Sequence, residues 1–462
     1  MRLPVYIGAT FVGAALLGAT PAFAAAAPAA SPQAVPQLGA AVTVSHLQGS
    51  SGTVIVQRAS GAPAAAVELW FRAPSIGFGD KPVPGLARVA AQTVAGSKPI
   101  VGPSLGDRIE AVGGHLAIIA YADSLAVAAL VPADAAPEIV KAMTIAYFSP
   151  VISEEGFSDA VRDVAMEALI SGFDPATVVR NDAFGQLFAN GPDHYPVLGS
   201  AKDVSAVTLT LVRGFAERAF RAQNAVLVVS GAVSDAVLAG ASRGRPVQAN
   251  SPFELAETPI SSVVSTSLVP VREHFDEAAA GYAWAGPPIG REDEATAMDF
   301  IADYLFRPGA GVASRAVEEQ MPGAFVTGQF ITLHNPGVMF VAFGDGDLTK
   351  LRPIVDRSLA QMRTALSAER FSSARDAFEY HLLSDLQTPT EMADNFGWYS
   401  VEGNLPYAPG ADGKAGRYFA AAAALTPEFV AQVAEKYLTK TPASVILVPN
   451  PPKSSAAKGQ PS

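Results

Sequence analysis

One short pattern in the sequence has the spacing of a nucleophilic catalyst. Gly102 to Gly106 (GPSLG) matches G-x-S-x-G, the nucleophile elbow, in which a strained turn between a strand and a helix presents a serine hydroxyl. Only the short segment Lys98 to Val101 stands before it, where such an elbow follows a strand. A serine that caps the first turn of a helix explains the same residues. We therefore expect Ser104 to be a helix N-cap.

Residues that bind metals are present, but their spacing forms no metal site. Two histidines one helical turn apart could hold zinc together, and no pair among the 6 histidines has that separation. The chain contains no cysteine, which excludes disulfides, thiolate nucleophiles and cysteine-type zinc sites. We expect each histidine to lie on the surface or to be hydrogen-bonded in the core: His46, His115, His194, His274, His334 and His381.

Acidic residues also occur at spacings that could suggest chemistry. The segment Asp345 to Asp347 matches the start of a calcium loop, but Lys350 stands where that loop needs glycine, so the segment predicts a turn. The pairs Glu154-Glu155 and Glu318-Glu319 are neighbours in sequence, and neighbours do not face each other on a helix. We interpret both pairs as parts of solvated helix faces.

The elements that would position a site are strands and helices mixed along the chain. Short apolar or alternating runs predict strands, and longer apolar stretches with helical periodicity predict helices. Hairpin-like spacings favour an α+β fold, in which helices pack on one face of a largely antiparallel sheet. Strands are predicted at Gly52 to Val56, Leu116 to Tyr121 and Leu125 to Val131, and helices at Ala135 to Phe148, Ala160 to Ile170, Ala295 to Phe306 and Leu351 to Ala365.

The chain repeats its own pattern of elements, which indicates a duplicated lobe. In the first half, Phe157-Ser158 opens a helix, another helix follows from Leu209, and Asn224 to Val229 is predicted as a buried strand. The same order recurs in the second half at a nearly constant offset. Its members there are Phe371-Ser372, Leu425 to Leu438 and Ala443 to Val448.

Composition shifts predict the domain boundaries. Serine, arginine, glycine and proline residues between 234 and 262 break the periodicity and predict a linker. The predicted order is a signal peptide at 1–24, an N-terminal lobe at 38–233, the linker at 234–262, a C-terminal lobe at 263–450 and a flexible tail at 451–462.

The first residues are typical of an exported protein. Met1-Arg2 is a short positive start, Val5 to Leu17 is apolar, and Ala22 to Ala24 is a small-x-small cleavage site. The apolar run is shorter than a membrane span needs, so we expect a periplasmic protein without a membrane span after signal removal. The formal net charge of −11 and the absence of a basic patch argue against a nucleic-acid partner.

The order of segments around Gly85 to Gln92 carries a family resemblance. This segment predicts the start of a small-residue helix; it follows the apolar run Val67 to Phe71 and precedes a Gly-Gly strand at 113–116. The arrangement resembles the insulinase/pitrilysin family of zinc peptidases, the inverzincins, in which a Gly-Leu-Ala-type segment leads into H-x-x-E-H. The resemblance spans about Leu38 to Val448 and rests on the order of weak motifs. It implies two tandem homologous insulinase-type α+β lobes that can enclose a peptide.

The zinc-site positions of that family hold unsuitable residues here. The two zinc-binding histidines fall on Arg88 and Gln92, the catalytic glutamate on Ala91, and the third ligand, a glutamate on a later helix, on Ala168. Guanidinium has no lone pair for a metal, an amide is a poor zinc ligand and a methyl group cannot move a proton. The resemblance therefore implies no catalytic residue, bound metal or cofactor. Glu167 is rotated by about 100° around a helix, away from the site.

A second half-site of the family is also altered. The loop Gly309 to Arg315 resembles a family loop of small residues that ends in Ser-Arg. Family members then carry an Arg and a Tyr, seven residues apart, that stabilise the oxyanion of the substrate. The tyrosine position falls on Phe325, which has no hydroxyl, and the arginine position on Glu318, which has the wrong charge. Arg315 stays a candidate for polarising the substrate carbonyl.

Two functions from different classes are consistent with these residues. The resemblance implies a catalytically inactive subunit that pairs with a zinc-bearing insulinase-family homologue to form a chamber for degrading or processing peptides. The alternative is an autonomous envelope protein that binds or scaffolds peptides by strand addition. Either would place the peptide along Gly113, Gly114, His115, Leu116 and Ala117, the equivalent of the family's peptide-contacting strand. An interior strand after a Gly-Gly turn explains the same segment.

Overall fold

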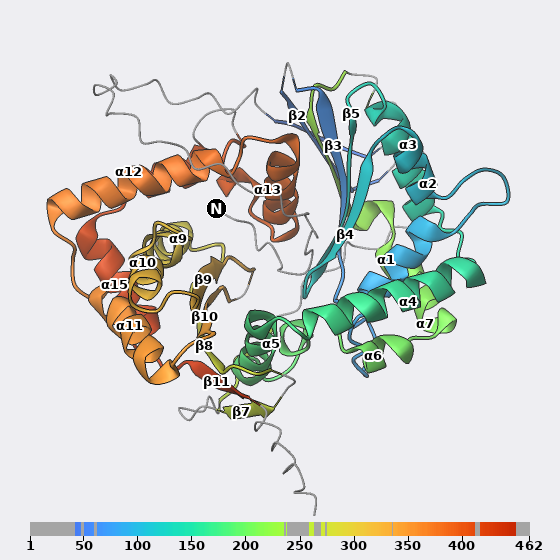
Figure 1. The fold of residues 1–462 in the computed structure, drawn as a ribbon. Helices are drawn as coiled ribbons and strands as arrows, with labels where there is room; N and C mark the ends of the chain where they lie inside the picture. The colour runs from blue at the N-terminus through green and yellow to red at the C-terminus, as the bar shows by residue number, and fades with distance from the viewer. Residues whose placement is uncertain are drawn as a thin grey trace, which may run out of the picture.

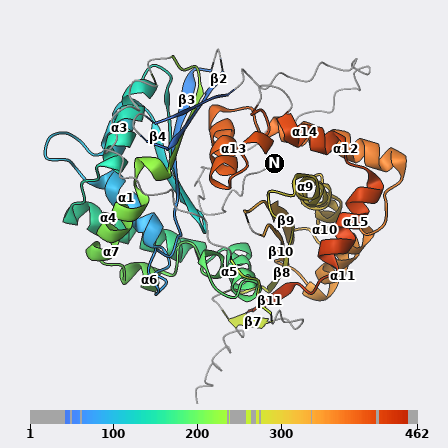
Figure 2. The ribbon, with the colours of Figure 1, turned by 180° about the vertical axis from the view of Figure 1, so that it is seen from behind.

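The computed structural model describes residues 42–47, 50–59, 62–234, 237, 258–262, 269–272, 275–334, 336–411 and 416–449. These residues form two lobes that lie side by side, each with one sheet and a layer of helices on the outer side (Figure 1). The view from behind shows the same division (Figure 2). The predicted α+β architecture of two tandem lobes is confirmed.

The first lobe contains a six-stranded sheet in the order β1-β2-β6-β3-β5-β4. β2 runs parallel to β6, and the other pairs are antiparallel. Because strand side chains alternate, Val67, Leu69 and Phe71 of β3 join one apolar cluster while Ala66 and Trp70 join another. The strands are β1 (Thr43–His46), β2 (Thr53–Arg58), β3 (Ala64–Arg72), β4 (His115–Ala120), β5 (Ser124–Pro132) and β6 (Ala225–Gly231).

The second lobe repeats this topology. Its sheet has the order β7-β11-β8-β10-β9, which matches β2-β6-β3-β5-β4, and the parallel pair β7 and β11 matches the parallel pair β2 and β6. The duplication predicted from the sequence therefore extends to strand direction. The strands are β7 (Val269–Arg272), β8 (Ala279–Ala285), β9 (Phe325–Ile331), β10 (Val338–Gly344) and β11 (Ala443–Val448).

The helices follow the same order in both lobes. The first lobe has α1 (Leu86–Gly96), α2 (Leu105–Ala111), α3 (Ala136–Phe148), α4 (Glu154–Ser171), α5 (Pro175–Leu187), α6 (Ala201–Ser205) and α7 (Leu209–Ala219), with 3-10 turns at Pro192–His194 and Ala222–Asn224. The second has α9 (Glu292–Phe306), α10 (Val312–Gln320), α11 (Leu348–Gln361), α12 (Ala368–Ser384), α13 (Pro389–Val401), α14 (Gly416–Ala423) and α15 (Pro427–Leu438), with a 3-10 turn at Leu405–Tyr407. Thus α1 corresponds to α9, α4 to α12 and α5 to α13.

The two lobes exchange one helix each. α5 leaves the first lobe and packs on β8, β10 and β11, whereas α13 leaves the second lobe and packs on β3 and β6 (Figure 1). Glycines allow both close approaches: a Cβ on Gly281 would lie 2.3 Å from Cγ1 of Val179, and one on Gly397 would lie 2.1 Å from Nε1 of Trp70. Helices therefore cover both faces of each sheet. The expectation of helices on one face alone is incomplete, because the second layer comes from the other lobe.

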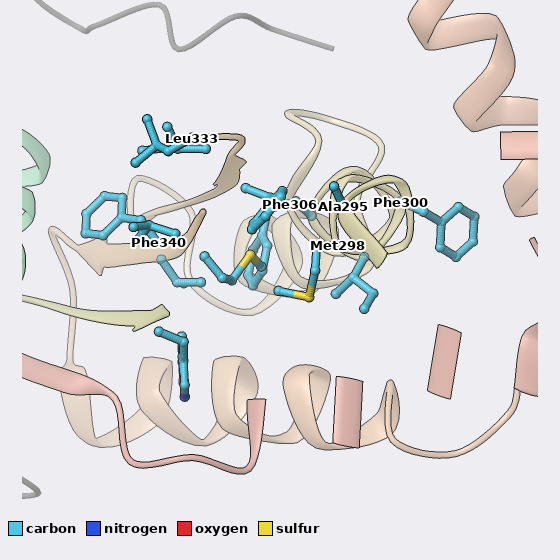
Figure 3. Close-up of a cluster of buried hydrophobic side chains, with 14 of the residues drawn as sticks. Ala295, Met298, Phe300, Phe306, Leu333 and Phe340 are labelled. Carbon is cyan, nitrogen blue, oxygen red and sulfur yellow. The ribbon is translucent and has the colours of Figure 1, made fainter. Parts of the chain in front are cut away.

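Aromatic and aliphatic side chains fill the space between the second sheet and its helices. α9 supplies Met298, Phe300 and Phe306, and β10 supplies Phe340 (Figure 3). The same continuous cluster includes Trp70 of the first lobe. The exchanged helices thus join the two lobes through one apolar core.

Most predicted elements are confirmed within a few residues. The strands predicted near Gly52, Leu116 and Leu125 are β2, β4 and β5. The helix predicted at Leu351 to Ala365 ends earlier, at Gln361, before a turn. No helix in the part of the chain that the structure describes is long and apolar enough to cross a membrane.

The predicted domain boundaries stay predictions. Residues 238–257 of the predicted linker, the predicted signal peptide and the predicted tail lie outside the described residues.

We predict that Gly397→Ala will destabilise the protein, because the new methyl group would overlap the buried indole of Trp70 and push α13 off the first sheet. Overpacking of this kind costs about 1–3 kcal/mol in the free energy of unfolding, to be measured by urea denaturation. The matched control is Gly214→Ala in α7, where the added methyl group meets nothing within 4 Å. Equal stability of the two variants would contradict the close packing of α13.

Candidate functional site

α1 and α4 lie side by side and carry the positions expected to correspond to a zinc site. α1 begins after Gly85, whose φ of 84° lies in the left-handed region and whose Cβ position would be 2.5 Å from the carbonyl oxygen of Leu198. Glycine at this position lets the chain turn tightly into the helix. Ala91 and Ala168 are both buried, and the hydroxyl of Tyr147 donates to the carbonyl oxygen of Ala91 at 2.9 Å.

Arg88 occupies the centre of this site. Its Nη1 donates to Oε1 of Gln92 at 2.8 Å, and its Nη2 lies 2.9 Å from Oε2 of Glu167. The side chains of Arg88 and Glu167 are only 13% and 27% exposed, so water screens this ion pair less than a surface pair. Burial raises the pKa of Glu167, and the charge and hydrogen bond of Arg88 oppose that rise.

The expectation that Glu167 points away from the site is wrong. A rotation of about 100° separates it from Ala168 on an ideal helix, but the long side chains of Glu167 and Arg88 bridge that displacement. The site therefore contains one cation and one carboxylate in direct contact. Length and flexibility of the two side chains outweigh helical phase.

These residues do not fit a zinc ion. The guanidinium of Arg88 only donates hydrogen bonds, Gln92 presents an amide that accepts from it, and Ala91 and Ala168 have no donor atoms. Arg88 itself supplies a positive charge between α1 and α4. No group of three histidine, aspartate, glutamate or cysteine side chains within the described ranges is arranged to hold a metal ion.

The segment predicted to contact peptide forms an edge strand. Gly113 has a φ of 75°, and a Cβ on Gly114 would lie 2.7 Å from Cγ1 of Val131. β4 then begins at His115 and continues through Leu116 and Ala117, paired with β5 alone. Its other backbone edge faces no strand among the residues described. The interpretation of this segment as an interior strand is therefore wrong, and its role in peptide binding stays a prediction.

The second-lobe candidates are placed apart from that strand. Arg315 lies exposed on α10 and lines a pocket formed by second-lobe residues, including Arg370 and His381 of α12. Phe325 begins β9, and its ring lies against Gly344 of β10. The structure does not bring Arg315 to the same pocket as any residue of α1 or β4.

Two other sequence expectations are confirmed. The Ser104 hydroxyl accepts from the backbone N–H of Asp107 and forms a capping box at the start of α2, as expected for an N-cap. Asp345 has a φ of 55°, and Asp347 caps α11, which makes this segment a turn before a helix.

The buried carboxylates between the lobes could not be assigned from sequence. Glu68 of β3 is fully buried and accepts from Nε1 of Trp70 at 2.8 Å. It also faces Asp394 of the exchanged helix α13. Burial, followed by the negative charge of Asp394, raises the pKa of Glu68 well above its ordinary value. Glu68 therefore keeps its proton to a higher pH than an exposed glutamate. The one sequence signal is a glutamate inside the apolar run Ala64–Arg72.

Comparisons with solved structures agree with the fold. No family model matches this sequence, and no curated protein matches it. Solved structures do match. A protease from Helicobacter pylori has a TM-score of 0.74 at 14% identity, over 89% of this chain and 99% of that chain.

Two further structures carry more specific descriptions. A peptidase M16 inactive domain from Pseudomonas fluorescens has a TM-score of 0.71 at 17% identity, over 89% of this chain and 100% of that one. A putative M16-like peptidase from Alicyclobacillus acidocaldarius has a TM-score of 0.71 at 16% identity, over 88% and 98%. The chain has the M16 fold, the fold of the insulinase-type peptidases, and it lacks the H-x-x-E-H motif.

If α1 and α4 retain the spacing of a zinc site, three substitutions should create one. We predict that the triple variant Arg88→His, Gln92→His, Ala168→Glu binds about one zinc ion per chain, because it restores three ligands of tetrahedral zinc. Metal content after gel filtration measures this, with the wild-type chain and Arg88→His alone as controls. A folded triple variant without zinc would show that the two helices are not spaced for a metal.

The carboxylates between the lobes predict an unusual pH dependence. An unfolded Glu titrates near pH 4.3, whereas folded Glu68 keeps its proton to higher pH. Above about pH 4.3 the folded state therefore binds more protons than the unfolded state, and the free energy of unfolding falls as pH rises. Burial also raises the pKa of Asp394 and Asp123 to about 6, and of Asp193 to about 7, with the same sign.

Glu68→Gln keeps the shape and an oxygen that accepts from Nε1 of Trp70, but it cannot titrate. Urea denaturation between pH 5 and 8 should show a decline that is shallower by up to about 1.4 kcal/mol per pH unit. Glu435→Gln, on the exposed face of α15, should leave the slope unchanged. An unaltered slope in Glu68→Gln would mean that Glu68 is ionised in the folded protein.

Proposed function

We propose that this chain is a catalytically inactive subunit that pairs with a zinc-bearing insulinase-type homologue and forms part of a peptide-processing chamber. The observation that carries the proposal is the ion pair between Arg88 and Glu167 in the place of a metal site. The pair compensates the positive charge of Arg88 with a protein carboxylate. The guanidinium of Arg88 cannot bind zinc, and the methyl group of Ala91 cannot act as a general base for hydrolysis.

Retention of the whole fold supports a role that depends on surface and shape. Both lobes keep the same strand order, and both exchanged helices are in place. A zinc-bearing partner would supply the metal, its three ligands and the general base. This chain would supply a wall that excludes bulk water. Its contribution to catalysis would therefore be indirect.

The edge strand β4 supports a direct contact with peptide. Among the described strands β4 pairs with β5 alone, so an extended chain can add to its outer edge at Leu116–Ala120 through main-chain hydrogen bonds, without a particular sequence. The N-terminal pattern from Met1 to Ala24 supports export, and a periplasmic location is part of the proposal.

A second candidate is an autonomous peptide-binding protein of the envelope. The observation that favours it is that β9, like β4, is an edge strand, so each lobe offers an edge to an extended chain. This function needs no partner subunit. The two candidates predict different results in a mixture with a zinc-bearing chain: an inactive subunit should raise the peptidase activity of that chain, and an autonomous binding protein should not.

Co-expression with an exported M16-type chain that carries H-x-x-E-H tests the proposal. We expect this chain alone to bind no stoichiometric zinc and to cleave no unstructured peptide, because Arg88, Ala91, Gln92 and Ala168 provide no ligand or base. The pair should co-elute in gel filtration, bury well over ~1,000 Å², and cleave peptide faster than the zinc-bearing chain alone.

Two results would count against a subunit role. If the zinc-bearing chain is fully active alone and this chain neither co-elutes nor changes its rate, the autonomous binding protein becomes the better explanation. One tightly bound zinc ion per chain of this protein, lost when residues near Arg88 are changed, would overturn the proposal of an inactive site.

A further inference from the structure

An acidic cavity of about 550 Å³ lies in the second lobe, between α9, the edge strand β9, the end of α12 and the start of α13. Thr327, Gly328, Gln329 and Phe330 of β9 form one side of it. Its lining contains a set of carboxylates: Asp299, Asp303, Asp385, Glu391 and Asp394.

The one cationic side chain in that lining is already engaged. Arg307 donates to both carboxylate oxygens of Asp385, at 2.9 and 3.0 Å, and lies 3.4 Å from Asp303. Nδ1 of His381 lies 2.9 Å from the same Asp303. Asp303 and Asp385 are thus compensated within the protein. Asp394 has no such partner among the described residues that line the cavity.

Asp394 lies where the cavity meets the interface between the lobes. Its Oδ1 is buried and accepts no hydrogen bond from the described part of the chain. Burial raises the pKa of Asp394 to about 6, and the adjacent Glu68 is a second carboxyl group, so it supplies no positive charge to Asp394. An ionised carboxylate that is buried without a cation is costly, and protein carboxylates in such positions normally face a positive partner.

The chemistry of the lining selects the kind of cation. The described carboxylates are not arranged as a group of three ligands around one point, so a metal ion does not fit. An ammonium or guanidinium group can instead reach one carboxylate through directed hydrogen bonds. β9 borders the cavity, and among the described strands it pairs with β10 alone. An extended peptide added to its free edge would direct alternate side chains towards that face.

We propose that this cavity binds the lysine or arginine side chain of a peptide that lies along β9, with Asp394 as its ionic partner. The inference rests on the proposed peptide-binding function and names the class of peptide bound in the second lobe. It assigns a specificity-determining role to Asp394, which does not belong to the altered zinc site.

A pair of synthetic peptides tests this with the full chain. One is an unstructured decapeptide with a single central arginine, and the other has citrulline, a neutral isostere, at that position. Calorimetry should show at least tenfold tighter binding of the arginine peptide. Asp394→Asn should remove the difference in affinity between the two peptides. Glu435→Gln, which removes the same charge from the exposed face of α15, should keep that difference.

A second variant covers the case in which Asp394→Asn does not fold. Gln329→Lys places a tethered ammonium beside the cavity and should also abolish the preference for arginine. Equal binding of both peptides to the wild-type chain would overturn the cavity assignment and leave peptide binding intact. Failure of both peptides to bind would overturn the cavity assignment together with peptide binding by this chain. If both variants still prefer the arginine peptide, the arginine side chain binds at another site and the cavity assignment is wrong.

Discussion

The exchange of α5 and α13 is the constraint on which the rest of the structure depends. A sheet with helices on one face leaves its other face apolar, and each lobe covers that face of its neighbour with one helix. The contact is close because Gly281 and Gly397 have no side chain. At the centre of one contact, Tyr121 stacks on Trp70 with ring centroids 5.5 Å apart and meets Trp398 edge-on at 4.9 Å. This packing links the two lobes through their shared apolar core.

An ion pair lies between α1 and α4 in the first lobe, at the positions where the family resemblance would place zinc. A zinc ion between α1 and α4 would join the two helices, and the Arg88 to Glu167 ion pair joins them here without metal. A pair of this kind contributes little net stability compared with apolar packing, but the loss of one partner would leave the other partly buried and uncompensated. The site is therefore a local structural contact between two helices. It provides none of the electrophilic assistance that a metal gives to peptide hydrolysis.

The sequence predicted the repeat of elements well because local periodicity and spacing specify it. The strands near Gly52, Leu116 and Leu125 and the duplicated helices and strands are found where their patterns indicate. The exchanged helices were not predicted, because α5 and α13 have ordinary helical patterns and only tertiary contacts show which sheet they cover. The contact of Glu167 with Arg88 was missed because the angular position of a residue on a helix does not determine where the end of a long side chain lies. The Glu68 and Asp394 pair was missed because it joins residues far apart in the chain.

Each lobe carries one polar site beside corresponding helices of the repeat. The Arg88 site lies between α1 and α4, and the acidic cavity lies between the corresponding helices α9 and α12. Each site contains an arginine paired with a carboxylate: Arg88 of α1 with Glu167 of α4 in the first lobe, and Arg307, directly after α9, with Asp385, directly after α12, in the second. The first site is balanced by this single pair, whereas the second retains further carboxylates beyond the pair. The two ion pairs are not counterparts in the repeat, because Arg88 lies in the first turn of α1 whereas Arg307 follows the last residue of α9. The difference in carboxylates between the two sites, next to the edge strand β9, is the basis of the peptide selectivity that we propose for the second lobe.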